Sequence, residues 1–269
     1  MPVIDAVVKL VEGSELENET FTILDLCCGK GYLSMLLSEL VRAASAPLFE
    51  PAIFSDSDQL PVEKISKIVL VDKMFAMTNM TPSAKHISWT HIYGSKMKCE
   101  DQAIPNYSES WPIKLETAKV DLKAGRELRS LEKRFLQGHG PVILVAIHLC
   151  GTLSLKAVEL FNRNSDVKFF CLKPCCLPGM VHAKRNEIFQ LGGHSFDSKE
   201  VCMAGKWKKN KWIGPPRSVT KNFFDRWADN LFWGIDETDA EKSKRTIMVQ
   251  TAGGYQNEFL YAQRVARRE

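Results

Sequence analysis

A glycine-containing loop near the N-terminus has the composition of a nucleotide-binding turn. An apolar run at Phe21–Cys28, typical of a buried strand, breaks at Gly29 and Gly31 and passes into a helical pattern at Tyr32–Ala44. Glycine lets the backbone approach a ligand at positive φ, and the N–H groups that begin a helix are free to bind an anion. The order strand, glycine turn, helix therefore predicts a nucleotide-cofactor loop. An ordinary βα turn that needs glycine would give the same pattern.

A carboxylate follows the second predicted strand. The strand Lys67–Val71 ends at Asp72, and an acid in that place can accept both ribose hydroxyls of a nucleoside. The gap from Asp25 exceeds the usual ~20 residues, and an insertion rich in Pro, Ser and Asp at Ala46–Lys64 accounts for most of the excess. Asp121, after the third predicted strand, is a second candidate, for the adenine amino group. Either aspartate would look the same as a solvated loop residue.

A histidine ends the clearest buried strand of the sequence, Val142–His148, just before Cys150 and Gly151. In parallel α/β sheets, ligands bind beyond the carboxyl ends of the strands. A histidine there can act as a general base near neutral pH. A lone histidine is more often structural, so both roles stay open.

Two adjacent cysteines, Cys175 and Cys176, follow the fifth predicted strand, Val167–Leu172, together with Lys173. Three roles are open for them: small apolar residues that line a pocket, a nucleophilic thiolate whose pKa Lys173 lowers, or zinc ligands together with Cys150 and the histidine. Zinc sites use spaced C-x₂₋₄-C pairs, and Cys150 forms none with either cysteine. We therefore favour pocket lining and expect no metal.

A basic segment interleaved with tryptophan lies in the C-terminal third. Seven lysines or arginines and one acid fall between Lys199 and Lys221. Lysines can neutralise phosphates, and tryptophans can stack on exposed bases. A solvated loop with two packed tryptophans is an equally good interpretation. The candidate substrate-binding residues are Lys206, Trp207, Lys208, Lys209, Lys211 and Trp212.

Alternating strands and helices must position these residues. The alternation predicts a mostly parallel sheet with helices on both faces. We expect one domain over residues 1–269, with insertions at about 46–64 and 177–244. Later elements are a third strand at Ile113–Val120, helices at Ala183–Leu191 and Val219–Leu231, and a terminal hairpin of Arg245–Thr251 and Glu258–Val265.

Whole-chain properties are those of a soluble globular protein. The net charge is +4 with a pI near 8.5, which permits an anionic partner without requiring one. The N-terminus lacks a secretory pattern, and the apolar runs are too short to span a bilayer. We expect a cytoplasmic protein with reduced cysteines and no membrane partner; a nuclear or organellar location stays open, as does the oligomeric state.

The motifs together resemble a known family. The D-x-x-x-G-x-G pattern from Asp25 to Gly31 resembles the first motif of Rossmann-like methyltransferases, with Cys27 where another glycine is usual. With H-L-C-G at His148–Gly151 and the cysteine pair Cys175–Cys176, the chain resembles the eukaryotic tRNA 2′-O-methyltransferases of the acceptor stem and the methyltransferase-like proteins that share their domain. Their zinc-binding modules find no counterpart before Phe21, and Leu177 replaces the histidine that usually follows the cysteines.

The resemblance implies a seven-stranded sheet with an antiparallel last strand and S-adenosylmethionine as cofactor. It also implies an RNA hydroxyl, on tRNA or a similar molecule, as methyl acceptor. The residues it assigns to the cofactor are Asp25, Gly29, Gly31 and Asp72. We add Cys27, Tyr32, Asp121 and His148 as further candidates for cofactor binding. The residues it places at or near the active site are His148, Cys150, Cys175 and Cys176. We add Lys173 as a further catalytic candidate.

We therefore expect an S-adenosylmethionine-dependent methyltransferase acting on an oxygen or nitrogen atom of RNA. Methyl transfer requires in-line alignment and removal of a proton, for which His148 is the candidate base; Lys173 would stabilise a developing alkoxide. One alternative is pyrimidine C5 methylation with Cys175 or Cys176 as nucleophile. Another is a non-catalytic module that binds RNA or a protein partner. A nicotinamide dehydrogenase is disfavoured by Ser34 in place of the third fingerprint glycine.

Overall fold

The structure is a computed structural model, and it divides into two compact units, Met1–Val145 and Ala146–Glu269. The residues that the structure describes are 2–13, 20–45, 64–76, 85–88, 90–93, 111–202, 206–208, 211–214, 216–248 and 256–265. Most of the expected insertion at 46–64 lies outside the described residues, as does Lys209. The expectation of a single domain with two insertions stays a prediction.

The fold is an α/β structure with a seven-stranded sheet in the order β10-β11-β5-β4-β1-β2-β3. Strand β11 (Glu258–Arg264) is antiparallel to both neighbours, β10 and β5, whereas β1 pairs in parallel with β2 and with β4. The sequential order reverses between β1 and β4, which is the switch point where such sheets bind ligands. The mostly parallel sheet with an antiparallel last strand confirms the expected fold class.

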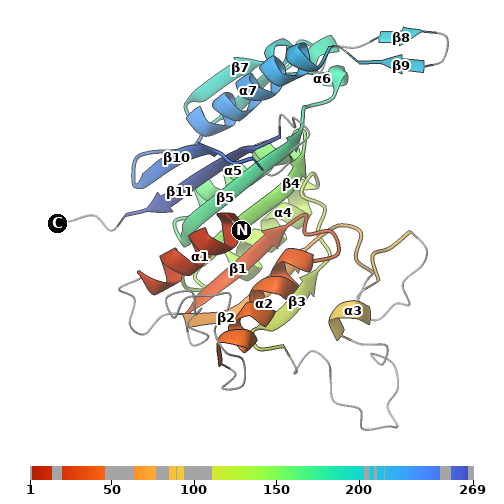
Figure 1. Cartoon of the computed structure of the whole chain (residues 1–269). Helices are drawn as coiled ribbons and strands as arrows, with labels where there is room; N and C mark the ends of the chain where they lie inside the picture. The colour runs from red at the N-terminus through yellow and green to blue at the C-terminus, as the bar shows by residue number, and fades with distance from the viewer. Residues whose placement is uncertain are drawn as a thin grey trace. The chain divides into compact units, whose positions relative to one another are not determined.

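In the first unit, three parallel strands carry helices on both faces. The strands are β1 (Phe21–Leu26), β2 (Ile65–Val71) and β3 (Lys114–Ala118), and the helices are α1 (Pro2–Glu12), α2 (Tyr32–Ser45), α3 (Thr90–Tyr93) and α4 (Gly125–Phe135). Figure 1 shows α1 and α2 in front of the strands and α4 behind them. Every residue of β1 is buried, as expected for a parallel strand covered on both faces.

The second unit continues from the end of β4 (Val142–Cys150). Its elements are α5 (Leu153–Arg163), β5 (Val167–Cys176), α6 (Met180–Lys184), β6 (Ile188–Leu191), β7 (His194–Asp197), η4 (Ser198–Glu200), β8 (Lys206–Lys208), β9 (Lys211–Ile213), α7 (Arg217–Trp233), β10 (Ala240–Thr246) and β11. Helix α7 contacts the β10–β11 hairpin (Figure 1). Strand β6 pairs with β7. Trp227 of α7 is fully buried against Phe189 and Phe196 of that small sheet.

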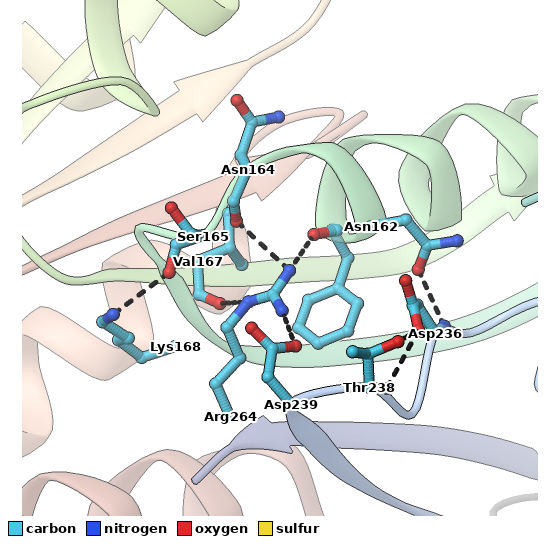
Figure 2. A network of polar contacts seen from close by, with 10 residues as sticks. Asn162, Asn164, Ser165, Val167, Lys168, Asp236, Thr238, Asp239 and Arg264 are labelled. Atoms are coloured by element: carbon cyan, nitrogen blue, oxygen red, sulfur yellow. Dashed lines mark hydrogen bonds and ion pairs between the residues drawn. The ribbon is translucent and has the colours of Figure 1, made fainter. Parts of the chain in front are cut away.

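One arginine fastens the last strand of this unit. The Arg264 guanidinium donates to the carbonyl oxygens of Val167 (3.1 Å) and Phe161 (2.6 Å) and forms an ion pair with Asp239 (Figure 2). Its side chain is 8% exposed and lies over the Phe161 ring. The antiparallel strand β11 is thereby joined to the end of α5 and the start of β5.

Several predicted elements are shifted or wrong. The expected helix Ala183–Leu191 is wrong from Arg185 onward: α6 ends at Lys184, Asn186 takes φ 52°, and Phe189 and Leu191 alternate with exposed residues as strand β6. The hairpin strand expected at Arg245 already begins at Ala240, because pairing with β11 holds a polar stretch extended. None of the helices in the described part of the chain has the length and apolar character needed to cross a bilayer.

Candidate functional site

The loop after β1 adopts the backbone geometry that its glycines predict. Cys27, Gly29 and Gly31 have φ values of 52°, 57° and 76°. Positive φ is costly for residues other than glycine, by about 1–2 kcal/mol. The methyltransferase pattern usually has glycine at the position of Cys27. The positive φ of Cys27 explains why glycine is usual there.

Two glycines of the loop have different structural roles. A Cβ at Gly31 would lie 2.0 Å from Leu70 Cδ2 in β2, so any larger residue would have to displace the Leu70 side chain where α2 starts. A Cβ at Gly29 would meet nothing within 4 Å. Gly31 therefore serves packing, whereas Gly29 exposes backbone at the end of β1, where a ligand can approach it closely.

Asp72 is held in place at this loop by two backbone donors. Its Oδ2 accepts from the Gly29 N–H at 3.1 Å, and its Oδ1 accepts from the Met74 N–H at 2.8 Å. Each carboxylate oxygen can accept a further hydrogen bond. The side chain is half-buried at the end of β2, so it can still bind hydroxyl groups of a ligand.

Asp25 is buried beneath the glycine loop, and its side chain does not face the solvent side of the loop. It is 3% exposed within β1, and its Oδ2 accepts from Ser34 Oγ of α2 at 2.7 Å. Burial raises the pKa of Asp25 to about 7, opposed by the Ser34 hydrogen bond and reinforced by the negative charge of Asp72. The structure thus places Asp25 beside the cofactor loop as a residue that positions α2.

Tyr32 and a histidine missed by the sequence analysis border the same loop. The Tyr32 side chain is 64% exposed at the start of α2, and its ring centroid lies 6.3 Å from that of His91 in α3. His91 Nε2 lies 2.7 Å from the Lys30 carbonyl oxygen of the loop. His91 is 61 positions from Lys30 in the chain, and no local pattern marks it.

Asp121 directly follows a segment that is hydrogen-bonded to the backbone of Asp72: the Val120 N–H donates to the Asp72 carbonyl oxygen at 3.4 Å. Strand β3 ends at Ala118, two residues earlier than expected. Asp121 Oδ1 accepts from the Lys123 N–H at 2.9 Å, and the Asp121 N–H donates to Glu127 Oε2 at 2.7 Å. These bonds form a turn that leads into α4, and the expected contact of Asp121 with the adenine amino group stays a prediction.

A second group of the expected site residues lies in the Ala146–Glu269 unit. His148 was expected at the end of its strand, but β4 continues to Cys150 and His148 lies inside it, at φ 66°. Its side chain is exposed. Burial of part of the ring, and then the positive charge of Lys173, lower its pKa. A neutral imidazole is the form that can accept a proton.

Three thiols converge at the ends of β4 and β5. Lys173, Cys175 and Cys176 were expected in a loop, yet they belong to β5, which runs to Cys176 because the Gly151 N–H donates to the Cys176 carbonyl. Cys175 Sγ lies 3.1 Å from Cys150 Sγ and 3.6 Å from Cys176 Sγ. Burial raises the pKa values of Cys175 and Cys176, so neither thiol has the lowered pKa that marks a nucleophilic cysteine.

Lys173 lies next to these thiols and is itself buried. The residue is 7% exposed, and its Nζ lies 5.8 Å from the centroid of the Phe259 ring in β11. Burial lowers its pKa, and the neighbouring Cys175 and Cys176 oppose that effect. In the part of the chain that the structure describes, no carboxylate forms an ion pair with it.

The basic segment forms a hairpin rather than a loop. Strands β8 and β9 are antiparallel, and their register places Trp207 opposite Trp212, and Lys208 opposite Lys211. Lys208 is exposed. The hairpin is a small sheet of its own and shares no ladder with β6 and β7.

Residues 2–182 match a family model described as a methyltransferase domain. None of the curated proteins compared with the chain is a significant match. Among solved structures, the chain is similar to one from Listeria monocytogenes, named as a candidate S-adenosylmethionine-dependent methyltransferase. That structure is 10% identical over 97% of this chain and 100% of that chain, with a TM-score of 0.34. This likeness is too distant to carry an argument.

Proposed function

The chain belongs to the family of methyltransferase domains, and from this premise we propose that it is an S-adenosylmethionine-dependent methyltransferase. The cofactor, when bound, supplies an activated methyl group on a sulfonium. The observation that carries the proposal is the hydrogen bond between the Gly29 N–H and the Asp72 carboxylate, which joins the exposed glycine loop to the acid after β2.

The residues of the first unit fit the chemical groups of this cofactor. The free acceptor capacity of Asp72 suits the two ribose hydroxyls. Gly29 exposes backbone at the switch-point end of β1, and the N-terminus of α2 offers N–H groups for the methionine carboxylate. Tyr32 and His91 present rings beside the loop, and Asp25 and Gly31 hold α2 in position.

The test of this proposal is methyl transfer itself. Wild-type protein with radiolabelled cofactor is expected to label an acceptor in total cellular RNA or protein, and Asp72→Ala is expected to lose the labelling. A matched Asp225→Asn variant, which changes a carboxylate of α7 that pairs with Lys221, should label normally. If wild type binds the cofactor but labels neither pool, the non-catalytic alternative, an RNA- or protein-binding module, would be favoured.

The second unit supplies a candidate base for removing the proton from the methyl acceptor. His148 is exposed, and its pKa lies below the usual value, so the ring is neutral near pH 7. We assign it the role of base or acceptor-orienting group. Lys173 is the candidate cation for a developing alkoxide. The alternative of pyrimidine C5 methylation is disfavoured by the raised pKa values of Cys175 and Cys176.

RNA is the acceptor class that we propose, with tRNA as the first substrate to try. The support is the basic hairpin β8–β9, whose register pairs two tryptophans and two lysines. Changing Lys206, Lys208 and Lys211 to Ala should weaken RNA binding and reduce the slope of log affinity against log salt by about one for each phosphate that is no longer neutralised. Unchanged affinity and slope at low salt would remove the hairpin from the RNA-binding surface.

A further inference from the structure

The three converging thiols of the second unit have a geometry that neither methyl transfer nor pocket lining requires. The Sγ atoms of Cys150, Cys175 and Cys176 all lie within 4.8 Å of one another. Cys175 Sγ lies 3.1 Å from Cys150 Sγ and 3.6 Å from Cys176 Sγ. Thiolates held about 2.3 Å from one tetrahedral zinc ion lie about 3.8 Å apart. The observed spacing therefore fits three ligands of one metal ion.

The backbone around the thiols is fixed by hydrogen bonds from outside the cluster. The Gly151 N–H donates to the Cys176 carbonyl oxygen at 3.2 Å, and the Gln256 side chain donates to the Cys175 carbonyl oxygen. Gly151 takes φ 55°, and a Cβ there would meet the backbone of Leu177 and Pro178 at 3.5 Å. Outer contacts of this kind hold metal ligands in their orientation.

The charge balance gives an independent reason to expect a ligand. Lys173 is 7% exposed, and within the described residues no carboxylate pairs with it, although a buried cation normally needs an anionic partner. A divalent ion with three thiolates carries a net charge of minus one. The Lys173 ammonium, two positions before Cys175 in the chain, would compensate that charge.

We propose that Cys150, Cys175 and Cys176 form a binding site for a thiophilic divalent cation, with zinc as the expected ion, and that the fourth coordination position takes a ligand from outside this cluster. Each ligating thiol releases its proton to solvent as its sulfur–zinc bond forms, and the ion keeps its oxidation state. Cys150 and Cys176 are exposed, which gives the ion a path of entry. This site is separate from the proposed cofactor function and does not depend on it.

The usual sequence spacing of zinc ligands is missing here because the three cysteines come from two different strands. Cys150 and Cys175 are 25 positions apart and meet because each lies at the carboxyl end of its strand. The absence of a C-x₂₋₄-C pair is therefore no argument against a metal site. The geometry of the three thiols favours a metal site, although the sequence led us to expect none.

Cobalt titration of the metal-free, reduced protein tests the proposal. One equivalent of Co²⁺ should produce thiolate-to-cobalt charge-transfer absorption and the strong d–d bands of a tetrahedral site, and Zn²⁺ should displace it. Cys150→Ser, Cys175→Ser and Cys176→Ser should each weaken zinc binding by at least about 10–100-fold. Cys202→Ser, a buried cysteine of the same unit outside the cluster, should bind zinc as wild type does.

A second measurement needs no variant and so is independent of their folding. In wild type, zinc should protect Cys150, Cys175 and Cys176 from alkylation while Cys27 and Cys28 react at an unchanged rate. The proposal is overturned if wild type gives no tetrahedral cobalt spectrum, or if zinc leaves the alkylation of the three cysteines unchanged. A Cys150–Cys175 disulfide that persists in reducing buffer would overturn it as well.

Discussion

The Gly29 N–H donates a hydrogen bond to the Asp72 carboxylate across 3.1 Å. The loop after β1 and the acid after β2 are thereby joined, although 43 positions separate them. Because β1 and β2 are parallel neighbours, both features lie at the same edge of the sheet. A carboxylate fixed in this way loses little freedom when it binds a ligand, which favours affinity.

The two loop glycines should respond differently to alanine. Gly31→Ala brings a Cβ to 2.0 Å from Leu70 at φ 76°, so we expect a loss of about 2–4 kcal/mol in the free energy of unfolding. Gly29→Ala meets no atom within 4 Å and should cost only about 1–2 kcal/mol for its positive φ, while weakening cofactor binding. Urea denaturation and calorimetry measure the two effects. Equal stability losses in both variants would contradict the assigned roles.

Burial of Asp25 should make stability depend on pH. The pKa of Asp25 is about 7 in the folded protein against 3.8 for the free side chain, so between these values the native state binds more protons than the unfolded state. The free energy of unfolding should therefore fall as pH rises from about 4 to about 7, by up to about 4 kcal/mol, and level off above.

Asp25→Asn keeps an acceptor for Ser34 Oγ and removes the ionisation. We expect this variant to lose most of the decline, and to be more stable than wild type above pH 7. Glu241→Gln, a change at an exposed carboxylate of β10, should leave the profile as it is. Chemical denaturation across this pH range would refute the assignment if wild type and Asp25→Asn gave parallel curves.

Arg264 should be among the most sensitive positions of the second unit. Arg264→Ala leaves the carbonyl oxygens of Val167 and Phe161 and the Asp239 carboxylate without their donor, which we expect to cost about 3–5 kcal/mol of stability. Lys221→Ala removes an exposed (i, i+4) pair with Asp225 and should cost at most about 0.5 kcal/mol. A similar, small loss in both variants, by thermal or urea denaturation, would show that the network in Figure 2 contributes little.

Local sequence signals predicted the cofactor half of the fold. An apolar run, a glycine turn and an amphipathic pattern are contiguous from Phe21 to Ala44, and strand β1, the turn and helix α2 lie where they were expected. The acid at Asp72 was also found, because it follows an apolar run directly. The sequence could not predict that Asp25 faces the core. A strand buried on both sides has no polar face that would distinguish one side from the other.

Tertiary contacts decided the elements that were misplaced. The fifth strand was expected to end at Leu172, but β5 runs to Cys176. Strand β11 pairs only with Phe169–Leu172, so Pro174 lies in a part of β5 that this neighbour does not bond, which a proline tolerates. Strand β10 is too polar to be recognised without β11. His91 and the convergence of three thiols depend on residues far apart in the chain, so no spacing rule could have found them.

Calorimetric titration with S-adenosylmethionine and its demethylated product tests the central claim most directly. We predict binding by wild type at micromolar concentrations, and affinity about 10–100-fold weaker for Asp72→Asn, because hydrogen bonds to a charged group contribute about 1.5–3 kcal/mol. Asp225→Asn, in the α7 ion pair with Lys221, is the matched control and should bind normally. Absence of binding to well-folded wild type, or equal binding by wild type and Asp72→Asn, would contradict the assignment of the glycine loop and Asp72 as the cofactor site.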